Sequence, residues 1–340
     1  MIRVALDAMG GDHAPRVEVE GAIAAARELG ATVLLVGRPE ALKAELGRQR
    51  QRGLPIEIVP ASEVITMSDS PGLAFRKKRN SSVHLAAHLV RDGKADALVS
   101  AGNTGAVLAV ARFVLGMLPS VSRPALAAPF PTSRGGVAVI LDVGANVDSK
   151  VNHLLQFAVM GEIYYRTVFR ARRPRVGLLS IGEEESKGNE LVREAHNELK
   201  NIPLHFVGNV EGRDVFTGAV ADVIVSDGFI GNIALKISEG VAELISTKLK
   251  EALSSTLRAQ VGYVLSKRAY ADFRRKIDYS EYGGAPLLGV RGICVIAHGR
   301  SNPNAIKNAI RVAVEMAQGR VNEKIERELS AAWVTSIRED

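Results

Sequence analysis

Six loops rich in glycine and small polar residues are the segments of this chain best suited to bind a ligand. Each follows a short apolar run, and they cover residues 7–13, 100–105, 142–146, 180–189, 226–232 and 297–302. In a parallel sheet, such loops lie at the carboxyl ends of the strands and lead into helix N-termini. Backbone N–H groups and the helix dipole favour anions there. We therefore expect a site for an anionic or polar ligand where these loops converge on one edge of the sheet.

The contacts to that ligand are expected from glycine N–H groups and a few polar side chains of these loops. The candidate substrate-binding residues are Gly10, Gly11, Asp12, His13, Gly102, Asn103, Thr104, Gly105, Gly144, Asn146, Gly228 and His298. For His13 and His298, ligand contact and a hydrogen bond that orders the loop are equally compatible with the sequence.

Several familiar reaction chemistries lack their sequence signatures. The dinucleotide fingerprint, the P-loop and the nucleophile elbow are all missing. His84 and His88 stand four residues apart on an expected helix, but Leu85 occupies the place of the glutamate in a zinc-protease motif, which favours a packed pair. Cys294 lies in an apolar strand and is expected to be a buried thiol. These residues show no clear metal-ligand spacing.

Composition and charge place the chain among globular proteins with an anionic partner. Of its 340 residues 46% are hydrophobic, and the net charge of +7 suits nucleic acid, an anionic lipid surface, an acidic protein or an anionic substrate. The basic run 76–79 is either a solvated surface or a contact for an acidic partner, and it lacks the interleaved aromatic residues of a nucleic-acid platform. A single cysteine and the lack of a signal peptide or a span of about 20 apolar residues favour the cytoplasm.

The elements that must position the six loops alternate between strands and helices. Strands are expected over residues 2–6, 32–36, 56–59, 97–99, 137–141, 176–181, 204–207, 223–225 and 293–297. Helices are expected over residues 17–29, 39–51, 81–91, 104–117, 151–167, 190–199, 304–318 and from 231 onward. This alternation predicts a three-layer α/β/α fold with a mostly parallel sheet. We expect one catalytic unit over residues 1–340, with a long helical projection over about 231–278.

An amphipathic segment follows within that projection. Leu257, Val261, Val264 and Leu265 recur at helical spacing beside basic residues. Such a helix either lies in the interface of a bilayer or packs on the core or a second subunit. The sequence alone leaves both roles open.

The long motifs together resemble the bacterial phosphate acyltransferase family of phospholipid synthesis. The resemblance covers essentially the whole chain and is carried by residues 5–13, 100–105, 141–146, 180–189 and 226–232. It implies a fold similar to isocitrate dehydrogenases and phosphotransacetylases, and transfer of a fatty acyl group from acyl carrier protein to inorganic phosphate. It also implies no cofactor, a homodimer at the cytoplasmic face of the membrane, and delivery of acyl-phosphate to a membrane-bound glycerol-3-phosphate acyltransferase. Lys187 and Asn232 fall at the family's proposed catalytic positions.

The residues are compatible with a direct attack of bound phosphate on the thioester, without a covalent enzyme intermediate. Lys187 is expected to clamp phosphate or the oxyanion, unless it pairs with one of the glutamates at 183–185. Asn232 is expected to orient phosphate or the carbonyl, and it also suits a helix N-cap. Acyl carrier protein is acidic, so Arg76, Lys77, Lys78 and Arg79 are candidates to steer its approach.

Three other functions remain compatible with the sequence. The first is a phosphotransacetylase-like enzyme that uses acyl-coenzyme A. The second is a decarboxylating dehydrogenase on the same fold that uses a metal and a nicotinamide cofactor. The third is a scaffold for lipid enzymes that binds membranes without catalysing a reaction.

Overall fold

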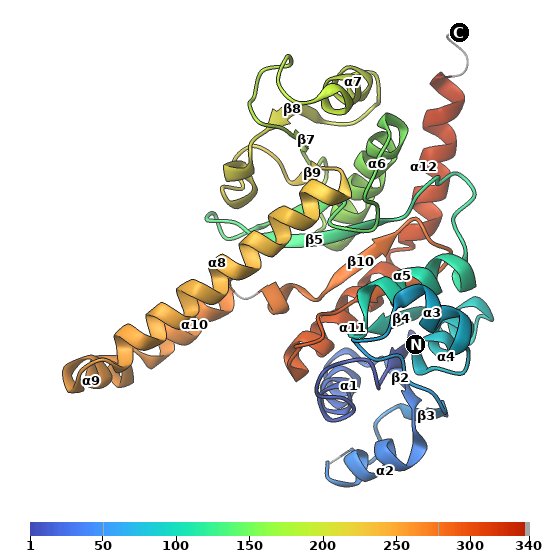
Figure 1. Cartoon of the computed structure of the whole chain (residues 1–340), viewed down its shortest axis with the longest axis vertical. Helices are drawn as coiled ribbons and strands as arrows, with labels where there is room; N and C mark the ends of the chain where they lie inside the picture. The colour runs from blue at the N-terminus through green and yellow to red at the C-terminus, as the bar shows by residue number, and fades with distance from the viewer. Residues whose placement is uncertain (50, 278, 337–340) are drawn as a thin grey trace.

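A single twisted sheet of eleven strands forms the centre of the molecule (Figure 1). The computed structural model describes residues 1–49, 51–277 and 279–336. The strand order across the sheet is β3-β2-β1-β4-β11-β10-β5-β6-β9-β7-β8. The strands are β1 (Arg3–Asp7), β2 (Thr32–Gly37), β3 (Ile56–Pro60), β4 (Ala97–Ser100), β5 (Ala125–Pro131), β6 (Val137–Leu141), β7 (Val176–Leu179), β8 (Phe206–Val210), β9 (Val223–Val225), β10 (Ala285–Leu288) and β11 (Ile293–Ile296).

The sheet consists of two parallel blocks that run in opposite directions. Strands β3, β2, β1, β4 and β11 are mutually parallel, and so are β6, β9, β7 and β8. Between the blocks, β10 is antiparallel to both β11 and β5, and β5 is antiparallel to β6. These three reversals place the carboxyl ends of the two blocks at opposite edges of the sheet.

Helices cover both faces of the sheet, which confirms the predicted three-layer α/β/α architecture. The helices on one face are α1 (Arg16–Leu29), α2 (Pro39–Gly47), α6 (Val151–Val168), α7 (Glu190–Leu199), α11 (Pro303–Gln318) and α12 (Val321–Ser336). The helices on the other face are α3 (Pro71–Lys77), α4 (Ser82–Arg91), α5 (Thr104–Val110) and the π-helical turn η1 (Ala111–Leu115). Strand β1 shows why both faces are needed: Val4 and Leu6 pack on the first layer and Ala5 on the second, so burial of all three requires helices on each side.

A helical arm projects from this body. It consists of α8 (Gly228–Ser254), α9 (Leu257–Leu265) and α10 (Lys267–Ile277), with α9 at the far tip (Figure 1). Only Gly228 and Gly231 of α8 are buried, and no residue of α9 is. Two short 3₁₀ turns complete the set, η2 (Gly212–Phe216) and η3 (Tyr279–Tyr282). Among the helices of the described ranges, none is both long and apolar enough to cross a membrane.

The sequence missed the elements that reverse the sheet. Strand β5 reads ALAAPFP and β10 reads APLL, so prolines and alanines conceal their strand character. Helix α12 was not expected, and the helix expected over residues 104–117 is α5 followed by η1. The long helix begins at Gly228 rather than at residue 231 because the Asp227 carboxylate accepts a hydrogen bond from the Ile230 N–H at 3.0 Å.

Candidate functional site

The six loops form two separate sets. The first set follows β1, β4 and β11, and its members touch: the Asp12 N–H donates to the Gly299 carbonyl at 2.9 Å, and Gly10 lies so close to Gly102 that a Cβ at Gly10 would collide with it. The second set follows β6, β9 and β7. Here Gly228 lies directly against Asn146.

These two sets stand at opposite edges of the sheet, so the expectation that all six loops converge on one edge is wrong for a single chain. Each set follows the carboxyl ends of one parallel block, and the blocks run in opposite directions. The nearest strands that carry the two sets, β11 and β6, are three strand steps apart, which corresponds to roughly 14 Å across the sheet. The unrecognised strands β5 and β10 are the cause of this error.

The first set rests on buried acids. Ser100 Oγ donates to Asp7 Oδ2 at 2.7 Å and accepts from the Gly102 N–H at 3.1 Å. Glu18 is 1% exposed, and its buried Oε2 has no hydrogen-bond partner among the residues that the structure describes. A Cβ at Gly11 would collide with its Oε1. Burial raises the pKa of Glu18 to about 7, and repulsion from Asp7 adds to the shift. Burial also raises the pKa of Asp7. This loop set is therefore supported by carboxyl groups that readily hold a proton.

Some side chains of the first set that were expected to contact a ligand instead form hydrogen bonds within the loops. Asn103 caps α5: its Oδ1 accepts from the Ala106 N–H at 3.1 Å and its Nδ2 donates to the Met67 and Asp69 carbonyls at 3.1 and 3.2 Å. His298 Nδ1 accepts from the Arg300 N–H at 3.1 Å, so this histidine does order its loop. In contrast, Asp12, His13 and Thr104 are exposed and accessible to a ligand.

The second set is organised by the buried carboxylate of Asp142. Its two oxygens accept five hydrogen bonds of 2.8–3.1 Å, from the backbone N–H groups of Leu126, Gly144, Ala145 and Asn146 and from the Asn146 amide. The Asn146 Nδ2 also donates to the Pro124 carbonyl at 2.7 Å. Asn146 is thus committed to holding the loop rather than being free for substrate.

Asn232 lies on α8 against this loop. The helix packs so closely that a Cβ at Gly228 or Gly231 would collide with the loop backbone. A Cβ at Gly144 would stand 3.4 Å from Asn232 Oδ1, so the amide borders the loop. Asp227 is the N-cap of α8, so Asn232 does not have the capping role that its residue type allowed. In the described part of the chain, its exposed amide has no hydrogen-bond partner.

Lys187 lies on the loop after β7, which neighbours β9 in the sheet. The side chain is exposed, and no carboxylate of the described residues lies within 4.0 Å of its ammonium group. Glu183 pairs instead with Arg213 at 3.4 Å, and Glu185 with Lys200 at 2.6 Å. The alternative in which Lys187 pairs with these glutamates is therefore wrong.

A buried pair holds the backbone of the Lys187 loop. His196 Nδ1 and Asn209 Oδ1 are 2.9 Å apart, and Asn209 Nδ2 donates to the Glu184 carbonyl at 2.9 Å. The Lys187 N–H donates to the same carbonyl at 3.0 Å. Sequence reasoning did not predict this contact between Asn209 and His196, because it joins α7 to β8. Glu18 was also missed, although a glutamate between two apolar residues of an amphipathic helix was a readable signal.

Reactive-thiol and metal chemistry find no support in the described residues. Cys294 is fully buried, as predicted, and burial raises its pKa to about 12. His84 is buried, bonds Ser81 Oγ at 2.8 Å and stacks on Phe75. Within residues 1–49, 51–277 and 279–336, no group of three or more His, Cys, Asp and Glu side chains is arranged to hold a metal ion.

Comparisons with known proteins agree with this architecture. Residues 2–324 match a family model described as fatty acid synthesis protein. The chain is 59% identical over 337 residues to a protein named phosphate acyltransferase from Koribacter versatilis, covering 97% of this chain and 94% of the relative. It is 52% identical to a protein of the same name from Geobacter sulfurreducens, covering 99% of this chain and 97% of the relative.

Solved structures resemble the chain in fold. A phosphotransacetylase from Streptococcus pyogenes superposes with a TM-score of 0.58 at 16% identity, covering 93% of this chain and 94% of that one. A 4-hydroxythreonine-4-phosphate dehydrogenase from Klebsiella pneumoniae superposes with a TM-score of 0.55 at 15% identity, covering 94% and 99%. At these identities the likeness shows the fold alone.

The buried acid Glu18 predicts a pH-dependent stability. The rise of its pKa from 4.5 to about 7 corresponds to roughly 3 kcal/mol. Because the folded state binds this proton more tightly than the unfolded state, the proton stabilises the fold. Its contribution to the free energy of unfolding is complete below about pH 4.5 and is lost as the pH rises through about 7. The free energy of unfolding of the wild type should therefore fall by roughly this amount relative to Glu18→Gln between pH 4.5 and 8. Chemical denaturation of both proteins across this range measures it, and parallel pH curves would show the assignment to be wrong.

Proposed function

The chain belongs to the family described as fatty acid synthesis protein, whose curated relatives are named phosphate acyltransferase, and from this membership we propose that it transfers a fatty acyl group from acyl carrier protein to inorganic phosphate. Transfer of an acyl group to phosphate is the part that these relatives support by name. The carrier-protein donor and the role in phospholipid synthesis are our proposal.

The observation that carries the proposal is that two polar side chains without partners among the described residues follow neighbouring strands at one edge of the sheet. The Lys187 ammonium has no carboxylate partner and the Asn232 amide has no hydrogen-bond partner within the described residues. Their loops follow β7 and β9, which are adjacent strands about 4.8 Å apart. The Asp142 loop supplies a rigid wall beside Asn232. A free cation and a free amide on a rigid support suit a small oxyanion.

The proposed reaction is a direct displacement. An oxygen of the bound phosphate attacks the thioester carbonyl and forms a new C–O bond. The tetrahedral intermediate then collapses, the C–S bond breaks, and the carrier leaves as a thiolate that takes a proton from water. Lys187 would offset the charge on phosphate and the oxyanion, and Asn232 would donate a hydrogen bond that fixes phosphate against the carbonyl. The thioester is already activated, so this reaction requires no enzyme nucleophile.

Removal of either side chain should abolish most of the activity without unfolding the protein, because both side chains are exposed. We expect Lys187→Ala and Asn232→Ala each to lower kcat/KM for phosphate roughly 100-fold or more. The assay is incubation of acyl carrier protein thioester with labelled phosphate and detection of labelled acyl-phosphate. The exposed residues Lys94→Ala and Asn201→Ala are matched controls with expected wild-type rates. Folded variants of Lys187 and Asn232 that retain full activity would rule out these roles.

An exposed apolar stripe on α8 supports the proposal that the protein is a homodimer. Its members recur every three or four residues and are 41–61% exposed: Ile230, Ile233, Ile237, Val241 and Leu244. An exposed apolar stripe of this length indicates that another apolar surface packs on it. The same stripe on a second copy of the chain can do so, because a two-fold axis brings two identical stripes face to face. Since α8 begins within the second loop set, this contact lies next to the proposed phosphate site.

We further propose that the site is shared between the two copies, because the two loop sets are too far apart in one chain to meet. The first loop set of one copy would then contact the acyl donor that is bound at the second loop set of the other copy. Mixing two inactive variants tests this. Asp12→Ala/His13→Ala damages the first set and Lys187→Ala damages the second, and both change exposed side chains.

Shared sites predict that the mixed sample regains activity. Each mixed dimer contains one intact site, so random exchange of subunits should restore about a quarter of wild-type activity. If each site lay within one chain, every site would carry one defect and no activity would return. A fully active Asp12→Ala/His13→Ala variant would equally contradict a role for these two residues.

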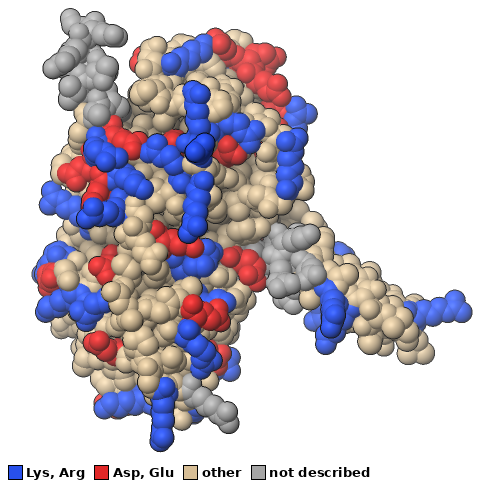
Figure 2. All heavy atoms as spheres, turned by 180° about the vertical axis from the view of Figure 1, so that it is seen from behind, with Lys and Arg blue, Asp and Glu red and all other residues tan. Residues whose placement is uncertain are grey.

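The tip of the arm supports a peripheral association with membranes. On α9, Leu257, Val261, Val264 and Leu265 are 60–82% exposed, and the sequence of this helix contains no acidic residue. On the side shown in Figure 2, the arm presents basic and uncharged side chains. A basic amphipathic helix of this kind binds the interface of an anionic bilayer. Acyl-phosphate released there would be close to a membrane-bound glycerol-3-phosphate acyltransferase.

Polar substitution of the tip should weaken this binding. We expect the fourfold variant with serine at 257, 261, 264 and 265 to lose most of its co-sedimentation with anionic vesicles, because burial of its apolar area drives the binding. Ile181→Ser/Val147→Ser is a matched control, since both residues are highly exposed apolar side chains of the body. Undiminished sedimentation of the fourfold variant would refute the role of the tip.

The competing functions have less support. The phosphotransacetylase and dehydrogenase structures share the fold at about 16% identity, which does not assign a reaction. An acyl-coenzyme A donor is the closest alternative, and measuring kcat/KM for both thioester donors distinguishes it. A scaffold without catalysis would show vesicle binding but no phosphate-dependent loss of thioester.

A further inference from the structure

Helix α3 and the turn η1 form an exposed surface with an aromatic centre. Leu73 is 56% exposed and Phe113 is 65% exposed. The Phe113 ring lies 5.2 Å from the Phe75 ring, and the Arg112 guanidinium lies 5.6 Å from the centre of the Phe113 ring. The aromatic side chain is thus held in place by its neighbours although most of it faces solvent. Large apolar side chains presented in this way are typical of the centre of a protein–protein contact.

Basic side chains surround this centre. Arg76, Lys77 and Arg79 are exposed, as is Arg112, and within the described residues none of the four has a carboxylate within 4.0 Å. The neighbouring Lys78 differs from them. Its ammonium binds Asp69 at 2.5 Å and donates to the Val64 carbonyl at 2.9 Å. Lys78 therefore stabilises the segment before α3, and the other cations are available to an acidic partner.

This surface borders the first loop set. The amide of Asn103 bonds the carbonyls of Met67 and Asp69, which lie just before α3, and a Cβ at Gly105 would collide with Pro71 at the start of α3. The loop that opens α5 and the helix α3 are thus one packed unit. A partner bound on α3 is positioned beside the loops after β1 and β4.

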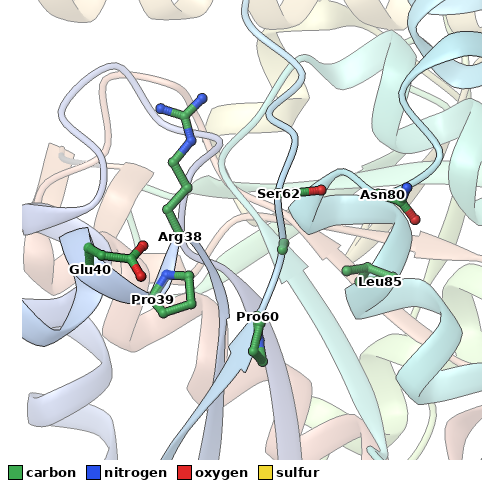
Figure 3. A pocket seen from close by; sticks show the side chains of 8 residues that line it. Arg38, Pro39, Glu40, Pro60, Ser62, Asn80 and Leu85 are labelled. Carbon is green, nitrogen blue, oxygen red and sulfur yellow. The ribbon is translucent and has the colours of Figure 1, made fainter.

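A hollow of about 510 Å³ lies at the carboxyl ends of β2 and β3, and Asn80, the residue that follows the basic run, lines it. Figure 3 shows Arg38, Pro39 and Glu40 on one wall, Asn80 and Leu85 on the other, and Pro60 and Ser62 between them. The wall carries both signs of charge, so the hollow does not select a small anion. It opens on the same edge of the sheet as the first loop set and enlarges the area that a protein partner can cover.

We propose that Leu73, Arg76, Lys77, Arg79, Arg112 and Phe113 form the docking surface for the acidic acyl carrier protein, named here the α3 surface. This inference rests on the proposed function. Four unpaired cations complement a negatively charged protein and would speed its encounter, whereas Leu73 and Phe113 would provide the desolvated centre. A lipid surface or a free anion would not require a fixed aromatic centre beside the active loops.

The test compares an acyl donor that includes the carrier protein with a small acyl donor that lacks it. The variants are Arg76→Glu/Lys77→Glu/Arg79→Glu and Leu73→Ser/Phe113→Ser. The matched control is Arg134→Glu/Arg172→Glu/Arg173→Glu, which reverses three exposed cations elsewhere on the body. For each protein, phosphate-dependent acyl-phosphate formation is measured with acyl carrier protein thioester and with acyl-pantetheine, a small donor that contains no carrier protein.

Both α3 variants should raise KM for the carrier thioester roughly tenfold or more at low salt, with kcat nearly unchanged. Their turnover of acyl-pantetheine and the kinetics of the control should match wild type. An unchanged KM for the carrier thioester overturns the proposal, as does an equal loss with both donors. A loss of vesicle binding with unchanged carrier kinetics overturns it too and assigns the surface to the membrane. If the wild type forms no acyl-phosphate from either donor, the proposed function fails instead.

If the double variant is poorly folded by its thermal transition, Leu73→Ser alone replaces it, because this exposed side chain contributes little to the core. The salt dependence provides a second readout. Raising the ionic strength should increase KM of the wild type for the carrier and have much less effect on the charge-reversed variant, since steering by exposed charges is screened by salt. Equal salt dependence of both proteins would contradict the proposal.

Discussion

The buried carboxylate of Asp142 is the interaction on which the second loop set depends. Burial raises the pKa of this carboxyl group, and five donated hydrogen bonds act against that shift by stabilising its ionised form. The same bonds fix the backbone that follows β6 and provide the surface on which α8 packs through Gly228 and Gly231. Asn232 is placed by that packing. The position of a candidate catalytic amide thus follows from the hydrogen bonds of one buried carboxyl group.

The reversal of the sheet is the second constraint. Because β10 and β5 separate two parallel blocks that run in opposite directions, the loop sets stand at opposite edges. One chain therefore presents a loop set that rests on buried acids at one edge, and the loop set that contains Lys187 and Asn232 at the other. The exposed stripe of α8 and the α3 surface then acquire related roles: one would join two copies, and the other would bring the carrier protein to them. Under these proposals the arm would provide both the dimer contact and the membrane contact.

Much of the fold was predictable from the sequence, because strongly apolar strands and amphipathic helices have a clear periodicity. Strands β1, β2 and β6 and helices such as α1 and α6 were found with errors of one or two residues at most. Strands β5 and β10 were not, because their proline- and alanine-rich sequences carry no strand signal, and the direction of the second block was lost with them. The candidate loops were predicted as motifs, but their division into two sets required the sheet topology.

The roles of individual side chains also depended on three-dimensional neighbours that the sequence does not reveal. The sequence allowed Asn232 to be an N-cap and Lys187 to pair with a glutamate, and only three-dimensional neighbours excluded both. The support of the Lys187 loop by Asn209 and His196 joins separate elements and has no sequence signal. Likewise, Lys78 belonged to a basic run whose members looked equivalent until Asp69 was seen to bind it.

The central claim is that phosphate bound by Lys187 and Asn232 attacks the donor directly, with no acyl-enzyme intermediate. Exchange of the carrier without phosphate tests it most directly: the enzyme is incubated with acyl carrier protein thioester and labelled free carrier, and label in the thioester is measured. Direct attack predicts no exchange until phosphate is added, because the thioester bond cannot break without it. Rapid exchange in the absence of phosphate would require an acyl-enzyme and would contradict the account.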